Sequence, residues 1–166
     1  ELKEYNEKAL EPCTIDGRIY GQPFGVNCTG MFYNKKLLEE NGCEVPESWE
    51  EFQETAAKIS NEDVKGFAIT ALQTEESMYE FLPILWSMGG DVYRIAEENS
   101  KKAFLLLDQM EKEGSLSLQS ISLTMGDLTN QFLKGKIGIM FNSSMAIDSI
   151  REGNTDLEFG VAPIPG

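Results

Sequence analysis

The residues whose types best suit a small ligand follow an apolar stretch at residues 137–141. They are Asn142, Ser143, Ser144 and Met145, which offer an amide, two hydroxyl groups and a thioether. In open α/β sheets, ligands bind beyond the carboxyl ends of strands, where free backbone N–H groups of the next helix point outward. This chemistry suits a ligand rich in hydroxyl groups. The alternative is structural, because Asn and Ser are also favoured at the N-cap of a helix.

A second candidate is the run Gly89, Gly90 and Asp91. Two glycines let a ligand approach the backbone closely, and a carboxylate accepts hydrogen bonds from hydroxyl groups. The same run also fits a helix C-cap followed by a turn, which requires no ligand.

Tyr79 and Trp86 are two of the three aromatic residues in the apolar segment 77–88. The ring of Tyr79, at the start of the segment, could stack on the C–H face of a sugar, although an aromatic ring there also fits the core. Trp86 lies deeper in the segment, and we expect it in the core.

The composition excludes several kinds of catalysis and leaves carboxylates as the candidate catalytic groups. The chain has no histidine, which excludes Ser-His-Asp and Cys-His catalysis and histidine-ligated metals. It has no phosphate-binding glycine motif, no nucleophile elbow and no acidic residues at calcium-loop spacing. We therefore expect neither a cofactor nor a metal. The enzymatic alternative is a glycoside hydrolase that uses two carboxylates, such as Asp91 and Asp148.

Cys13, Cys28 and Cys43 lie 15 residues apart each time. That spacing matches no zinc or redox motif, and an odd thiol would remain if two of them paired. We expect these cysteines to be small buried residues.

The negative net charge argues against nucleic acids and anionic membranes as partners. The 166 residues include 28 acidic and 14 basic side chains, which gives a net charge of −14. Nucleic acids and anionic membrane surfaces would be repelled. The longest apolar run, residues 81–86, is interrupted by Pro83 and is far shorter than the roughly 20 residues of a membrane span. The chain starts at Glu1 without an apolar signal segment, which predicts a piece excised from a longer protein.

Strands alternate with helices along the chain, which predicts an α/β fold in one domain. The clearest helix covers residues 49–60, because Ser48 and Glu51 form a capping-box pattern before apolar residues at helical spacing. The other expected helices are 35–40, 77–88 (buried on most faces), 101–112, 127–134 and 144–151, with a weak helical pattern over 1–10. The expected strands are 30–33, 66–71, 137–141 and 158–164, preceded by a turn at Asp16–Gly17 and an extended stretch at 18–24.

Four segments carry a resemblance to a known family. The longest, residues 16–52, reads DGRIYGQPFGVNCTGMFYNKKLLEENGCEVPESWEEF. It resembles the signature of bacterial extracellular solute-binding proteins, the family that includes maltose- and oligosaccharide-binding receptors of ABC importers. Further matches to the family are FLPILWSMGGDV, FLKGKIGIMFNSSMAI and FGVAPIPG.

The resemblance implies a type II periplasmic-binding-protein-like fold, with a mixed sheet flanked by helices. Residues 1–166 would form one lobe, the C-terminal lobe of two, with interlobe segments at about 1–25 and 158–166. The implied function is that of a non-catalytic receptor, which delivers a sugar or oligosaccharide to the membrane permease subunits of an ABC importer by lobe closure. The implied location is extracytoplasmic, either periplasmic or lipid-anchored at the cell surface.

The resemblance also assigns ligand-binding positions. It places Asn27 and Thr29 in a loop that reaches the cleft, Tyr79 where several members stack an aromatic ring on the sugar, and the other two candidate runs in cleft loops. Met145 stands where the family commonly has a tryptophan, and Ser143 replaces a glycine. A thioether lacks a flat aromatic face, which implies a smaller ligand or one held mainly by hydrogen bonds. A module that contacts only a protein partner is the remaining alternative.

Overall fold

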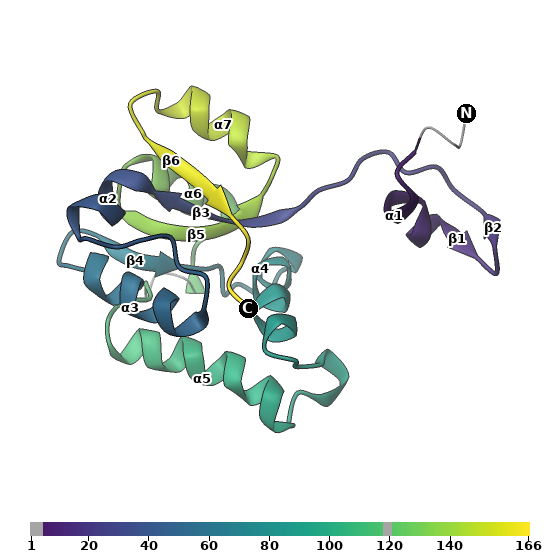
Figure 1. Cartoon of the computed structure of the whole chain (residues 1–166), viewed down its shortest axis with the longest axis horizontal. Helices are drawn as coiled ribbons and strands as arrows, with labels where there is room; N and C mark the ends of the chain where they lie inside the picture. Colours follow the sequence, from purple (N-terminus) through teal and green to yellow (C-terminus); the bar gives the residue numbers. More distant parts are fainter. Residues whose placement is uncertain (1–4, 118–120) are drawn as a thin grey trace.

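The computed structural model describes residues 5–117 and 121–166. Its centre is a four-stranded sheet in the order β4-β5-β3-β6, in which β4 and β5 are parallel and the other pairs are antiparallel. The mixed sheet confirms the predicted architecture (Figure 1). The strands are β3 (Thr29–Asn34), β4 (Lys65–Ala68), β5 (Ile137–Ser143) and β6 (Phe159–Ala162).

Helices cover both faces of this sheet, so β5 is buried along nearly its whole length. Side chains of a strand alternate between the two faces. Met31 and Phe141 accordingly pack in one core cluster, while Phe32 and Met140 pack in the other. The first cluster is completed by α3 (Trp49–Ile59), α4 (Glu75–Ser87) and α5 (Glu98–Lys112). The second is completed by α6 (Met125–Leu133) and α7 (Ala146–Gly153).

Local sequence signals set several helix ends as predicted. The Ser48 hydroxyl accepts the Glu51 N–H at 3.2 Å, and the Glu51 carboxylate accepts the Ser48 N–H at 3.4 Å, which confirms the capping box of α3. The predicted helix 35–40 matches α2 (Lys35–Glu40). The helix expected at 144–151 instead starts at Ala146, because Asn142 and Ser143 still pair with β3 as part of β5.

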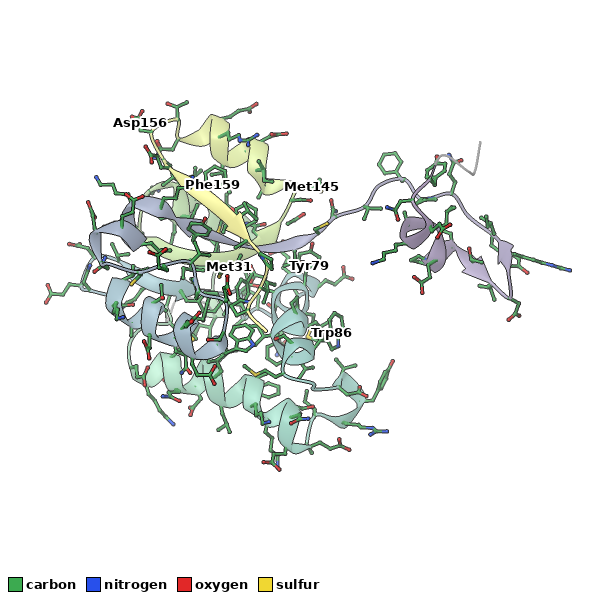
Figure 2. The ribbon with its side chains drawn as sticks, in the orientation of Figure 1. Met31, Tyr79, Trp86, Met145, Asp156 and Phe159 are labelled. Atoms are coloured by element: carbon green, nitrogen blue, oxygen red, sulfur yellow. The ribbon has the colours of Figure 1, made fainter. Side chains whose placement is uncertain are left out.

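Helix α4 differs from its prediction. It was expected to be buried on most faces, but only Glu80, Ile84 and Leu85 of this helix are buried. Trp86 is 58% exposed, so its expected place in the core is wrong (Figure 2). A helix turns by about 100° per residue, so a side chain two positions after Ile84 points away from the core. Apolar composition alone did not define which face would be covered.

Two strands are shorter than predicted. β4 ends at Ala68 rather than at residue 71, after which the buried residues Ile69 and Thr70 lead towards α4. β6 ends at Ala162 because Pro163 has no N–H to donate to the ladder.

The N-terminal residues form an arm that extends away from the sheet (Figure 1). It contains α1 (Glu7–Leu10), the 3-10 helix η2 (Glu11–Cys13) and a hairpin of β1 (Thr14–Ile15) and β2 (Arg18–Ile19). The predicted turn is confirmed, since Asp16 and Gly17 both have positive φ, at 49° and 73°. Of the predicted extended stretch, only Arg18 and Ile19 pair as a strand.

The prediction of buried cysteines is wrong. Cys28 is exposed, Cys13 and Cys43 are half-buried, and all three thiols are free. Cys13 belongs to the arm and Cys28 to the extended segment before β3, which do not pack into either core cluster.

Within residues 5–117 and 121–166, none of the helices has the length and apolar character needed to cross a membrane.

Candidate ligand-binding site

An open hollow of about 320 Å³ lies where the arm joins the body. Four of the predicted ligand-binding residues line it: Asn27, Tyr79, Ser143 and Met145. Figure 2 shows Tyr79 and Met145 on the side of the body from which the arm leaves. These residues come from three separate stretches of the chain, so the fold brings them together. The rest of the lining consists of Glu75, Glu76 and Met125.

The register of β3 and β5 positions two sides of the hollow. Thr29 pairs with Ser143 in the antiparallel ladder. Just beyond this pair, the Ser144 N–H donates to the Cys28 carbonyl at 2.9 Å, and the Cys28 N–H donates to the Ser144 hydroxyl at 3.4 Å. Continuing the same register places Asn27 opposite Met145, which explains why both reach the hollow.

The polar residues at the end of β5 have different roles. Met145, rather than Asn142 or a serine, occupies the N-cap position of α7, and no side-chain bond caps this helix. The N-cap interpretation of the run is therefore wrong. The Ser143 hydroxyl instead accepts the Met145 N–H at 3.2 Å, which fixes the turn that exposes the Met145 side chain.

Three further predicted residues lie beside the hollow without lining it. Asn142 is buried and donates to the Thr129 hydroxyl at 2.9 Å, which joins β5 to α6. Thr29 and Ser144 support the junction of the two strands through their pairing and hydrogen bonds. Their direct contact with a ligand stays a prediction.

The Gly89–Asp91 run lies at the other end of α4, about 18 Å from its first turn at 1.5 Å per residue. Gly89 has φ of 74°, and a Cβ on Gly90 would lie 2.5 Å from Leu85 Cδ1. The N–H groups of both glycines bond to carbonyls of the last helical turn, at 2.9 and 2.8 Å. The Asp91 carboxylate accepts the Tyr93 N–H at 2.8 Å and caps the 3-10 helix η3 (Val92–Arg94). These contacts match the C-cap interpretation, and a ligand role for the run stays a prediction.

Sequence reasoning missed Glu75, Glu76 and Met125. Glu75 and Glu76 lie one helical turn before Tyr79, so they share its side of α4. Placing the start of the helix at Glu75 instead of residue 77 would have identified both. Met125 comes from α6, and no local sequence signal links it to Tyr79. The link is tertiary, because the Glu76 carboxylate accepts the Met125 N–H at 2.9 Å.

The wall of the hollow is acidic. Among the residues that the structure describes, its lining includes two carboxylates and neither lysine nor arginine. Such a wall can accept hydrogen bonds from hydroxyl groups and repels anions. Apolar contact comes from the Tyr79 ring and from Met145, which is 71% exposed.

One acidic residue lies directly behind this wall. Glu80 is fully buried, and its Oε2 accepts the Thr70 N–H at 2.6 Å. Burial raises the pKa of Glu80 to about 7, against the opposing effect of that hydrogen bond.

The arrangement does not favour hydrolysis by Asp91 and Asp148. Neither lines the hollow, and the Asp148 side chain is largely exposed on α7. The described residues also contain no cluster of three or more potential metal ligands.

Comparison with known proteins agrees with this fold. Residues 1–166 match the family described as bacterial extracellular solute-binding protein. The chain is 29% identical over 168 residues to a binding protein of Brucella abortus, covering 96% of this chain and 41% of that protein. It is 27% identical over 172 residues to the maltotriose-binding protein of Pyrococcus abyssi, covering 99% of this chain and 35% of that protein.

A solved structure shows the same architecture. The chain superposes on maltose-bound MalE3 of T. maritima with a TM-score of 0.87 and 28% identity, covering 99% of this chain and 45% of that one. The fold is therefore that of a type II periplasmic-binding-protein lobe. The chain belongs to the family of bacterial extracellular solute-binding proteins. It spans less than half the length of these relatives.

Proposed function

We propose that this chain is the C-terminal lobe of a non-catalytic, extracytoplasmic receptor that binds a sugar or oligosaccharide for an ABC importer. The observation that carries the proposal is the convergence of Asn27, Tyr79, Ser143 and Met145 on one hollow. An amide, a hydroxyl, an aromatic ring and a thioether are groups that bind a neutral polyol. The sugars in the names of the maltotriose-binding and maltose-bound relatives support this ligand class.

The open shape of the hollow supports a second lobe. A hollow of about 320 Å³ that is open on one side leaves much of an oligosaccharide in solvent. A facing lobe that closes by hinge rotation would cover the rest and form the surface that docks on the permease subunits. The receptor would act outside the cytoplasm, in a periplasm or tethered to the cell surface by lipid.

The arm supports the first of the proposed interlobe segments, at about 1–25, while the second, at about 158–166, stays a prediction. Three apolar side chains in the stretch that leads into β3 are strongly exposed, namely Tyr20, Phe24 and Val26. Exposed apolar groups at this density indicate a surface that another part of the protein covers. We assign that role to the facing lobe.

Met145 sets an expectation for ligand size. It contributes dispersion at the position where a tryptophan would stack on a sugar ring, so one stacking platform is absent. We therefore expect a short saccharide held mainly by hydrogen bonds.

A thermal-shift screen of the full-length receptor tests this function. Maltose, maltotriose, raffinose and galactooligosaccharides form the panel. A ligand that binds only the native state, at 100 times its Kd, stabilises it by about 2.7 kcal/mol. We expect at least one sugar to raise the melting temperature and to be recovered chemically unchanged. A panel without any shift, or with a sugar that is hydrolysed, would contradict the proposal.

A further inference from the structure

Glu80 is the only acidic side chain buried within the described residues. It lies on the core-facing side of α4, one turn before Ile84, which is also fully buried. An ionised carboxylate is costly to bury unless it is paired. No described lysine or arginine forms an ion pair with Glu80, because the ion pairs among these residues involve other acids.

Its hydrogen bond ties a loop to the helix. Thr70 lies two residues after the end of β4, and its N–H donates to Glu80 Oε2 at 2.6 Å. This bond fixes the segment between β4 and α4 against the helix that it leads into. Glu80 Oε1 and the Thr70 hydroxyl are both buried and have no hydrogen-bond partner among the described residues. The Thr70 hydroxyl can donate to the carboxyl group in either protonation state, but a neutral carboxyl group needs no buried counterion, whereas a carboxylate does.

The same part of α4 forms the wall of the hollow. Glu75, Glu76 and Tyr79 line it, and Tyr79 is the neighbour of Glu80 in sequence. Glu76 holds this end of the helix to α6 through the Met125 N–H. The beginning of α4 is therefore held by two acidic residues one turn apart. Glu76 binds it to α6, and Glu80 binds it to the segment that follows β4.

The charged surroundings of Glu80 oppose ionisation. The charged group that acts on Glu80 is Glu76, in the preceding turn of α4. The Glu76 carboxylate raises the pKa of Glu80 further. From the segment after β4 the contact is the uncharged Thr70. In α6 the acidic Asp127 bonds to Thr124 at its own N-cap, and in α5 Lys112 pairs with Asp108.

We propose that Glu80 is a positioning residue of the ligand site, whose protonated carboxyl group holds the segment from Thr70 to Tyr79 in the binding arrangement, so that loss of the proton weakens ligand binding. This inference rests on the proposed sugar-receptor function. A buried carboxylate beside Glu76 is stabilised by water entry or by displacement of the start of α4, and either change disturbs the wall that carries Tyr79. Because burial raises the pKa of Glu80 to about 7, the change falls between pH 6 and pH 8.

Calorimetric titration of the full-length receptor with maltotriose, at pH 6 and pH 8, measures the effect. About one tenth of Glu80 is ionised at pH 6 and about nine tenths at pH 8, so Kd rises up to about tenfold if only the protonated form binds. Glu80→Gln keeps an acceptor for the Thr70 N–H and a donor for its hydroxyl. We expect this variant to bind as the wild type does at pH 6, with a Kd that changes less than twofold between the two pH values.

A matched control is Glu39→Gln, on the exposed side of α2, which removes one carboxylate elsewhere. It should keep the pH dependence of the wild type. The role of Glu80 is overturned if Glu80→Gln and the wild type show the same ratio of Kd values at pH 8 and pH 6.

Hydrogen exchange provides a readout that needs no variant. In the wild type without sugar, the protection of the Thr70 amide, relative to amides of β5, should fall between pH 6 and pH 8. A receptor that binds no sugar of the panel overturns the proposed function and this inference with it. A receptor that binds maltotriose equally at both pH values, with a constant exchange ratio, overturns the role of Glu80 alone.

Discussion

At the scale of single residues, the proposed ligand contact depends on four side chains that line one hollow. Tyr79 and Met145 supply apolar surface, while Asn27 and Ser143 supply polar groups. The surrounding polar residues, Asn142 above all, are engaged within the fold. Substitutions in the lining should therefore change affinity with little effect on stability, and substitutions behind it should change stability as well.

Tyr79→Ala tests the apolar contact. Losing the ring should weaken sugar binding to the full-length receptor about tenfold, which corresponds to about 1.4 kcal/mol. Calorimetric titration measures this change, and the melting temperature without sugar should stay close to that of the wild type. Tyr93→Ala is the matched control, because Tyr93 is 94% exposed and lies outside the hollow. Equal affinities of Tyr79→Ala and Tyr93→Ala would exclude Tyr79 from the site.

Met145→Trp tests the effect of the methionine that stands where the family resemblance leads us to expect a tryptophan. A flat ring at this exposed position should add a stacking surface and increase affinity for oligosaccharides by several-fold, since aromatic pairs contribute about 0.5–1.5 kcal/mol. Titrations with maltose and maltotriose would measure the gain. Met78→Trp, at another exposed methionine outside the hollow, should leave both affinities unchanged. Weaker binding in Met145→Trp would contradict a stacking role at residue 145.

Glu80→Gln has a separate effect on stability. The pKa of Glu80 rises from 4.5 to about 7 on folding, so the folded state retains the proton between these values. Wild-type stability therefore falls as pH rises from 4.5 to 7 and loses about 3 kcal/mol in total, at 1.36 kcal/mol per unit. Glutamine does not ionise, so denaturant unfolding should show the variant gaining stability over the wild type across this window and keeping the gain above it. A difference that does not change with pH would refute the raised pKa.

At the scale of elements, close backbone contacts set how helices sit on the sheet. A Cβ on Gly66, in β4, would lie 1.9 Å from the carbonyl oxygen of Ala56 in α3. Gly66→Ala should therefore force the strand and the helix apart and destabilise the protein by at least about 1–3 kcal/mol in urea unfolding. Gly25→Ala is the control, because nothing lies within 4 Å of its Cβ position. Similar urea midpoints for the two variants would show that α3 does not pack against β4 as closely as the Gly66–Ala56 contact requires.

Elements with strong local signals were predictable from the sequence. The capping box of α3, the short helix α2 and the buried strand β5 all depend on neighbouring residues, and the structure confirms them. The exposure of Trp86 was not predictable, because it depends on which side of α4 meets the sheet. The sequence likewise gave no sign of the buried Glu80, since a carboxylate on the core face contradicts the usual pattern of burial.

The candidate site was predictable to a similar degree. Residue types and their positions suggested Tyr79, Ser143 and Met145, the family resemblance added Asn27, and the fold brings these residues to one hollow. The sequence also suggested Gly89, Gly90 and Asp91. Their contacts are those of a helix end, and they lie at the end of α4 that is away from the hollow. Met125 requires the packing of α6 against α4, and such tertiary contacts leave no spacing pattern in a single sequence.

At the scale of the whole molecule, the proposed receptor would be a two-lobed clamp, of which this chain forms one half. The body has a hydrophobic core cluster on each face of its sheet, yet its hollow is open and its arm exposes Phe24 and other apolar side chains. The chain spans less than half the length of its relatives. A facing lobe would add contacts to the bound sugar that this lobe cannot make.

Calorimetric titration of one sugar into both the full-length receptor and the isolated 166-residue chain tests this claim most directly. If the facing lobe adds some four hydrogen bonds at about 1 kcal/mol each, its loss weakens binding by about a thousandfold. We predict tight binding to the full-length receptor and millimolar or undetectable binding to the isolated chain. Equal affinities for the two proteins would contradict the account.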